Sequence, residues 1–143
     1  MPLLKESPAP TRVRAAVRLG LAVLFVAAGL NHFRDPAFYE RILPGELPWP
    51  GFWVAFTGVA EVAGGLGLMT RPLRRAAGWG LVAMLAGFLW VHVDMLLRPV
   101  VVDGWRVPAW LLWVRLALQF PLIATVWWAA GLGRSVISRE MVS

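Results

Sequence analysis

Residues 57–69, TGVAEVAGGLGLM, place a single carboxylate, Glu61, inside an apolar and glycine-rich run. Such a run is typical of a membrane-crossing helix, where a charge near the centre costs roughly 2.5–3.5 kcal/mol on insertion scales. Glu61 should therefore have a partner inside the protein. Arg115 is the basic residue that lies within another apolar run, AWLLWVRLALQFPL. We therefore predict a helical bundle built around a Glu61–Arg115 pair.

The composition is that of a membrane protein. Of the 143 residues, 59% are hydrophobic and 15% are charged, against about 45–50% and about 25% in an ordinary soluble domain. Four apolar runs, each near the ~20 residues that a bilayer requires, fill most of the chain and leave no room for a soluble domain. The sequence predicts an all-α, polytopic membrane protein with a four-helix transmembrane bundle.

The net charge of +6 does not indicate a nucleic-acid partner, because the basic residues lie at the ends of the apolar runs. Membrane topology and lipid headgroups explain basic residues at such positions. Cysteine is absent, so the chain has no disulfide and no cysteine-ligated metal. Any redox role would need a bound cofactor or a partner protein.

The predicted organisation is one domain between two tails. Residues 1–12 and 131–143 are expected to be cytoplasmic tails, the first of them flexible. The domain, residues 13–130, should contain four spans, at about 13–32, 52–69, 73–97 and 109–130. A basic start before an apolar run also describes a signal peptide. The first run, however, continues to Leu30 without a clear small-x-small cleavage site, which favours a retained helix.

The connection between the first two spans, FRDPAFYERILPGELPWPG, is the longest in the chain. Asp35 and Pro36 can open a short helix there, with aspartate as the N-cap and proline in the first turn. We expect this helix to lie at the membrane interface over the bundle. The connection between the last two spans should turn at Asp103-Gly104.

The distribution of lysine and arginine predicts the orientation. The side of the N-terminal tail carries nine of them: Lys5, Arg12, Arg14, Arg18, Arg71, Arg74, Arg75, Arg134 and Arg139. The opposite side carries four: Arg34, Arg41, Arg98 and Arg106. The excess of positive charge on cytoplasmic loops predicts a multi-pass protein of the cytoplasmic membrane with both termini in the cytoplasm.

This orientation brings the polar intramembrane side chains to the centre and the outer half of the bilayer. Gly58 and Gly65 share a helical face with Glu61 and let a neighbouring helix approach closely, so Glu61 should face the interior. Arg115 and Gln119 share another face at i, i+4 spacing. The candidate ligand-binding or structural polar cluster comprises Glu61, Arg115, Gln119, Asn31, His32, Asp94 and His92.

Each member of this cluster also has a purely structural interpretation. Glu61 and Arg115 can form an ion pair that fixes helix register, and His92 can be a hydrogen-bonded core histidine. Asn31 and His32 can mark a helix end at the interface, and Asp94 can reach water or Arg98. No histidine and carboxylate spacing resembles a metal motif. We assign no metal site and no catalytic residue.

Several segments together resemble the DoxX family of small membrane proteins: AAGLNHFRDPAFYERILP, GVAEVAGGLGLM, RPLRRAAGWGL and WLLWVRLALQ. The similarity covers roughly residues 15–130. It implies a four-helix bundle in the cytoplasmic membrane. The DoxX-like proteins that the chain resembles include the membrane subunit of a thiosulfate:quinone oxidoreductase and proteins associated with oxidative-stress enzymes. A eukaryotic branch of these proteins assists receptor assembly.

The residues and the resemblance together leave three functions open. The first is an accessory subunit of a membrane redox or stress-related complex that binds a lipophilic ligand, with quinone as the best single candidate, or a partner helix. The second is the membrane subunit of a thiosulfate:quinone-type oxidoreductase, which needs a redox-enzyme partner. The third is a small transporter or assembly chaperone, and a homo-oligomer fits the transporter best. For the isolated chain we lean away from an enzyme.

Overall fold

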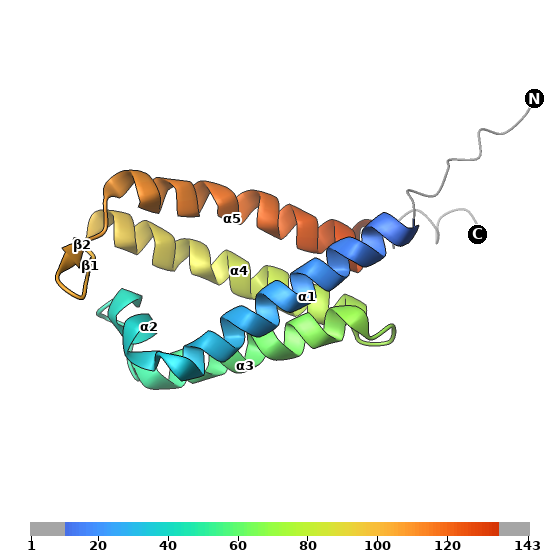
Figure 1. The fold of residues 1–143 in the computed structure, drawn as a ribbon, viewed down its shortest axis with the longest axis horizontal. Coiled ribbons are helices and arrows are strands. Elements are labelled where there is room, and N and C mark those ends of the chain that lie inside the picture. The colour runs from blue at the N-terminus through green and yellow to red at the C-terminus, as the bar shows by residue number, and fades with distance from the viewer. Residues whose placement is uncertain (1–10, 135–143) are drawn as a thin grey trace, which may run out of the picture.

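The computed structural model describes residues 11–134, and this part of the chain is mostly helical (Figure 1). Its elements are, in order, α1 (Thr11–Arg34), α2 (Pro36–Ile42), α3 (Pro50–Met69), α4 (Arg74–Leu97), β1 (Val101–Val102), β2 (Trp105–Arg106), α5 (Ala109–Ala130) and the 3-10 turn η1 (Leu132–Arg134). Four of the helices, α1, α3, α4 and α5, are long and apolar enough to cross a membrane.

The four long helices run between two ends of the molecule that differ in their connections (Figure 1). At one end lie α2 and the β1–β2 hairpin, and we call it the hairpin end. The other end contains the start of α1, the short turn between α3 and α4, and the end of α5. We call this the basic end. Helix α1 packs mainly on α3 and α4 mainly on α5, while α3 and α4 join the two pairs.

Glycines allow α1 and α3 to pack at very short distance, as the sequence predicts for the face that carries Glu61. A Cβ added to Gly58 would lie 2.8 Å from the Cβ of His32, and one added to Gly65 would lie 3.0 Å from the carbonyl oxygen of Ala22. On the α1 side, a Cβ on Gly29 would lie 2.6 Å from the carbonyl oxygen of Gly58. The backbones of the two helices are therefore in direct contact.

The short helix predicted between the first two spans is present as α2. The side chain of Asp35 caps it by accepting a hydrogen bond from the backbone N–H of Phe38 at 3.2 Å, and Pro36 stands in the first turn. Ile42, at its end, is buried in a small apolar cluster with Met95, Val100 and Leu112. This cluster fixes α2 against α4 and α5 at the hairpin end.

The predicted turn at Asp103-Gly104 is also present, and it closes a two-stranded antiparallel hairpin. Both turn residues have positive φ, 51° and 79°, the conformation that an Asp-Gly pair adopts readily in tight hairpins. The guanidinium of Arg41 on α2 donates a hydrogen bond to the carboxylate of Asp103 at 3.1 Å. The hairpin is thereby linked to α2.

The long helices begin and end within about two residues of the spans predicted from the sequence. At both ends, helical structure extends into the segments predicted as tails. Thr11 and Arg12 belong to α1 rather than to a tail, because the helix starts earlier than the apolar run. After α5 the chain forms η1 instead of an immediate tail. Residues 1–10 and 135–143, the remainder of the predicted tails, lie outside the described residues.

Candidate functional site

A cavity of about 340 Å³ lies between α1, α3, α4 and α5 in the half of the molecule nearer the hairpin end. Its polar lining consists of His32, Tyr39, Thr57, Glu61, His92, Arg115 and Gln119. Five of these were predicted from the sequence as members of the polar cluster. We call this space the polar cavity.

Glu61 pairs with His32 and not with Arg115. Its Oε2 lies 3.4 Å from Nε2 of His32, and both side chains are only 7% exposed. Within residues 11–134 the structure shows no ion pair between Glu61 and Arg115, so the predicted pair is wrong. The reason is the packing: the glycine face of α3 lies directly on α1, whereas α5 packs mainly on α4. Arg115 lines the same cavity from an exposed position on α5.

The other ring nitrogen of His32 is held by the backbone of α3. Nδ1 lies 2.9 Å from the carbonyl oxygen of Val54. A carbonyl oxygen can only accept, so Nδ1 carries a proton and donates it. In the neutral ring Nε2 would then present a lone pair to the carboxylate of Glu61, which repels it. One further proton, carried by Nε2 or by the carboxyl group, removes this repulsion.

Glu61 nevertheless keeps unused hydrogen-bonding capacity. In the described part of the chain its Oε2 is buried and has no hydrogen-bond partner, because the geometry to His32 is that of an ion pair without a hydrogen bond. Buried carboxylate oxygens without a partner are uncommon and each calls for an explanation. Here the oxygen belongs to a residue that lines the polar cavity, where a bound molecule can donate to it.

Tyr39 of α2 covers His32 and was not predicted as a site residue. The two rings stack with centroids 3.8 Å apart and planes inclined by 35°. Asn31, which was predicted to belong to the cluster, is exposed, and it donates a hydrogen bond to the tyrosine hydroxyl at 3.0 Å. Asn31 thus positions the tyrosine from outside the cavity. The Phe-Tyr pair after Asp35-Pro36, already part of the family resemblance, was the available signal for Tyr39.

On the opposite wall, Gln119 and His92 are both bound to the backbone of α4. The amide Nε2 of Gln119 donates to the carbonyl oxygen of Leu85 at 2.8 Å, and Gln119 is 6% exposed. Nδ1 of His92 lies 2.7 Å from the carbonyl oxygen of Phe88. Both side chains are thereby fixed in the cavity wall. Arg115 is close enough to His92 to act on it electrostatically.

Asp94 does not join the polar cavity. Its carboxylate accepts hydrogen bonds from the guanidinium of Arg98, one of them from Nε at 2.8 Å, which confirms the structural interpretation. This contact raises the pKa of Arg98, which lies beyond the end of α4. Arg98 also donates to the carbonyl oxygen of Leu43 at 3.1 Å. Asp94 and Arg98 therefore fasten α4 to the segment after α2.

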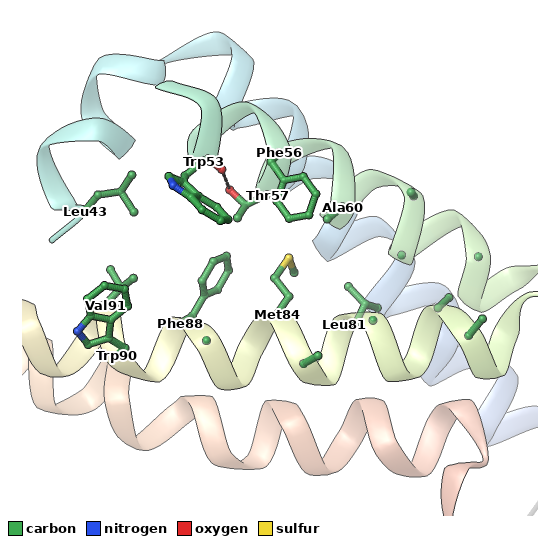
Figure 2. A pocket seen from close by; sticks show the side chains of 18 of the residues that line it. Leu43, Trp53, Phe56, Thr57, Ala60, Leu81, Met84, Phe88, Trp90 and Val91 are labelled. Carbon is green, nitrogen blue, oxygen red and sulfur yellow. Dashed lines mark hydrogen bonds between the residues drawn. The ribbon is translucent and has the colours of Figure 1, made fainter. Parts of the chain in front are cut away.

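A second space, about 680 Å³ in volume, runs between α3 and α4 and is lined almost wholly by apolar side chains. Figure 2 shows two facing rows of these side chains, with those of α4 directed toward α3. The labelled members are Leu43, Trp53, Phe56, Thr57, Ala60, Leu81, Met84, Phe88, Trp90 and Val91. We call this space the apolar groove.

The apolar groove adjoins the polar cavity. Four residues line both spaces: Leu43, Thr57, Phe88 and Val91. Trp53 adds a polar atom to the groove, since its indole Nε1 is buried and has no hydrogen-bond partner among residues 11–134. Small residues, among them Gly64, Gly80 and Gly87, also line the groove.

The fold and the site define a helical protein with a polar cavity between its helices and an apolar groove beside it. Residues 21–130 match the family described as Domain of unknown function (DUF8561), and the chain belongs to this family. The matched segment contains all the residues that line the polar cavity. No curated protein and no solved structure matches the chain.

Proposed function

We propose that the four long helices form a bundle in the cytoplasmic membrane with both termini in the cytoplasm. The lateral surface of the helices supports this location, because large apolar side chains are exposed on it. Examples are Val23, with an exposed fraction of 62%, and Val59, with 58%. Exposed tryptophans stand near both ends, with Trp49 and Trp110 at the hairpin end and Trp79 at the basic end. Tryptophan favours the two membrane interfaces.

The orientation predicts which sites a reporter can reach. Reporters fused after Ser143 should report a cytoplasmic location, and reporters inserted between Asp103 and Gly104 an external one, because the basic end carries the excess of arginine. Paired phosphatase and fluorescent-protein fusions at each site measure this. An externally accessible C-terminus would overturn the orientation.

We further propose that the polar cavity binds the head of a small lipophilic ligand whose tail lies in the apolar groove. The observation that carries this proposal is Oε2 of Glu61, which is buried at the cavity and makes no hydrogen bond within residues 11–134. The cavity volume of about 340 Å³ is within the ~300–1,000 Å³ of small-molecule sites. The groove continues from the cavity through Thr57 and Phe88, so one elongated molecule can occupy both.

A quinone and its quinol form are the ligands that these residues fit best, because a quinol hydroxyl can donate to Oε2 of Glu61. Arg115 on α5 supplies hydrogen-bond donors for a carbonyl oxygen, and the His32–Glu61 pair lies on another wall. Tyr39 and Phe88 bound the cavity with flat rings, and the groove suits an isoprenoid chain. When bound, a quinone supplies two-electron redox chemistry. The residues of this chain would bind it, orient it and hold a proton near it at the His32–Glu61 pair.

The resemblance to DoxX-family proteins supports a place for the chain beside a redox or stress-related enzyme, as an accessory or ligand-binding subunit. A second candidate is the membrane subunit of a thiosulfate:quinone-type oxidoreductase. The His32–Glu61 pair at the cavity favours it, since either group can hold a proton and quinone reduction consumes protons. Turnover with thiosulfate by the chain together with a redox partner would support this second candidate.

Ligand binding can be tested with a short-tailed quinone. We expect decylubiquinone to quench tryptophan emission of the detergent-solubilised protein in a saturable way, because Trp53 and Trp90 line the groove. Arg115→Gln should weaken binding roughly tenfold, the effect of losing a hydrogen bond to a charged donor. Arg34→Gln is the matched control, since Arg34 is exposed and lines neither space, and it should change the affinity less than about twofold.

Lipid-retaining preparations provide a second measurement. Organic extracts of the purified wild type should contain quinone in proportion to protein, and those of the Arg115→Gln variant should contain less. Unsaturable quenching together with quinone-free extracts would overturn the proposal. Proton or solute flux in liposomes that disappears in Glu61→Gln would instead support a transporter.

A further inference from the structure

A third cavity, of about 600 Å³, lies at the basic end, far from the polar cavity. The start of α1, the α3–α4 turn and the end of α5 enclose it. Five arginines line it: Arg12, Arg14, Arg18, Arg71 and Arg74. No carboxylate among residues 11–134 lines this cavity. Of the six aspartates and glutamates in this range, Glu61 lies near the middle of α3 and the other five lie at the hairpin end.

Contacts with the helix ends hold several of these guanidinium groups in place. Arg18 donates from Nη1 to the carbonyl oxygen of Ala129 at 3.3 Å, and Arg74 donates from Nε to that of Leu68 at 3.0 Å. Arg14 lies over the ring of Trp128, 4.7 Å from its centroid. A guanidinium has five N–H donors, so each hydrogen bond to a carbonyl leaves others for a ligand.

Membrane topology alone does not require this arrangement. The charge excess that orients a membrane protein acts through loops and helix ends, yet Arg18 lies about two turns inside α1. There it also experiences the positive charges of Arg74 and Arg14. Like charges that converge on one cavity repel each other unless an anion lies between them.

We propose that this cavity binds the phosphate group of an anionic membrane phospholipid. Arginine forks match phosphate oxygens in pairs, and basic pockets between helices at the cytoplasmic side are suited to lipid headgroups. Ala15, Ala129 and Ala130 form apolar parts of the wall. Val13 and Leu19 are about half exposed on α1, so acyl chains can continue along the helix surface. The proposal rests on the membrane location, but not on the ligand of the polar cavity.

The test compares charge removal at the two ends of the full-length protein. We expect the double variant Arg18→Gln/Arg74→Gln, purified in mild detergent, to retain at least fivefold less phosphatidylglycerol by mass spectrometry of its lipid extract. The matched control is Arg34→Gln/Arg106→Gln, which removes two exposed arginines at the hairpin end and should retain lipid within twofold of wild type. Equal retention in the two double variants would overturn the proposal.

Two further experiments distinguish loss of lipid binding from misfolding, and a phospholipid from free phosphate. Arg71→Gln removes an exposed member of the cavity, so it should fold normally and still lose at least half of the retained lipid. Added phosphatidylglycerol should raise the melting temperature of delipidated wild type by several degrees more than phosphatidylcholine does. A rise of the same size with inorganic phosphate alone would contradict a lipid site, and so would unchanged retention in Arg71→Gln.

Discussion

The variant His32→Ala should lose about 1–3 kcal/mol of unfolding free energy, the usual effect of leaving buried polar groups without their partner. The carbonyl oxygen of Val54 would lose its hydrogen bond, and the buried carboxyl group of Glu61 would lose its neighbour at 3.4 Å. The stacked contact with Tyr39 would be lost as well. Equilibrium unfolding in mixed micelles with increasing SDS measures this difference.

A double-mutant cycle isolates the contribution of the pair. Glu61→Gln keeps the shape of the side chain and removes its charge, so its own cost should be only about 1 kcal/mol. The double variant His32→Ala/Glu61→Gln should be more stable than His32→Ala alone, with a coupling energy above about 1 kcal/mol. Arg115→Gln is the control, and its exposed position on α5 predicts a change within about 0.5 kcal/mol.

Two results would contradict the pairing. Equal stability of His32→Ala and of the double variant would show that His32 does not compensate Glu61. A loss of several kcal/mol in Arg115→Gln would restore Arg115 as the partner predicted from the sequence.

Gly29→Ala should separate α1 from α3 and destabilise the protein by about 1–3 kcal/mol, the usual range for an overpacked interior. The added Cβ would lie 2.6 Å from the backbone oxygen of Gly58 and 2.8 Å from Cγ2 of Val62. A backbone oxygen cannot rotate away as a flexible side chain can. The helices must therefore move apart, which also disturbs His32 and Glu61 at the same interface.

Gly20→Ala is the matched control on the same helix. Nothing lies within 4 Å of a Cβ at this position, so the substitution should be neutral or should stabilise by up to about 1 kcal/mol through helix propensity. Melting temperatures of the two variants in one detergent provide the comparison. If Gly29→Ala melted at or above the temperature of Gly20→Ala, the close backbone contact would be refuted.

The sequence alone predicted the elements well, because each has a local cause. The lengths of the apolar runs determine the four long helices. Asp35-Pro36 opens α2, and Asp103-Gly104 turns the hairpin. The glycines around Glu61 correctly indicated a face for close packing, since small residues at helical spacing have that effect in any neighbour arrangement.

The partner of Glu61 was not predictable in the same way. Helical spacing tells which residues share a face, but not which neighbouring helix that face meets. The sequence places the cation Arg115 within an apolar run and His32 at the end of one. In the structure α1 crosses α3 so that His32 stands beside Val54 and Glu61. Tertiary packing decided the pairing.

The apolar groove could not be predicted from the sequence, for a similar reason. Alanines and glycines along α3 and α4 are equally compatible with tight packing, which occurs where Gly64 meets Leu81. Gly80, the neighbour of Leu81, and Gly87 have nothing within 4 Å of a Cβ. The same residue type thus produces contact at one point and open space at another, depending on the helix face it occupies and on how far the helices diverge.

The basic end has a chemical consequence for how the molecule responds to acid. Lys5 is the single lysine of the chain, so every cation among residues 11–134 other than histidine is an arginine, and arginine keeps its proton at any pH a folded protein survives. Both histidines and all the carboxylates of this part lie at mid-height or toward the hairpin end. Acidification therefore makes the hairpin half more positive, while the charge that residues 11–134 contribute around the cavity lined by five arginines stays constant.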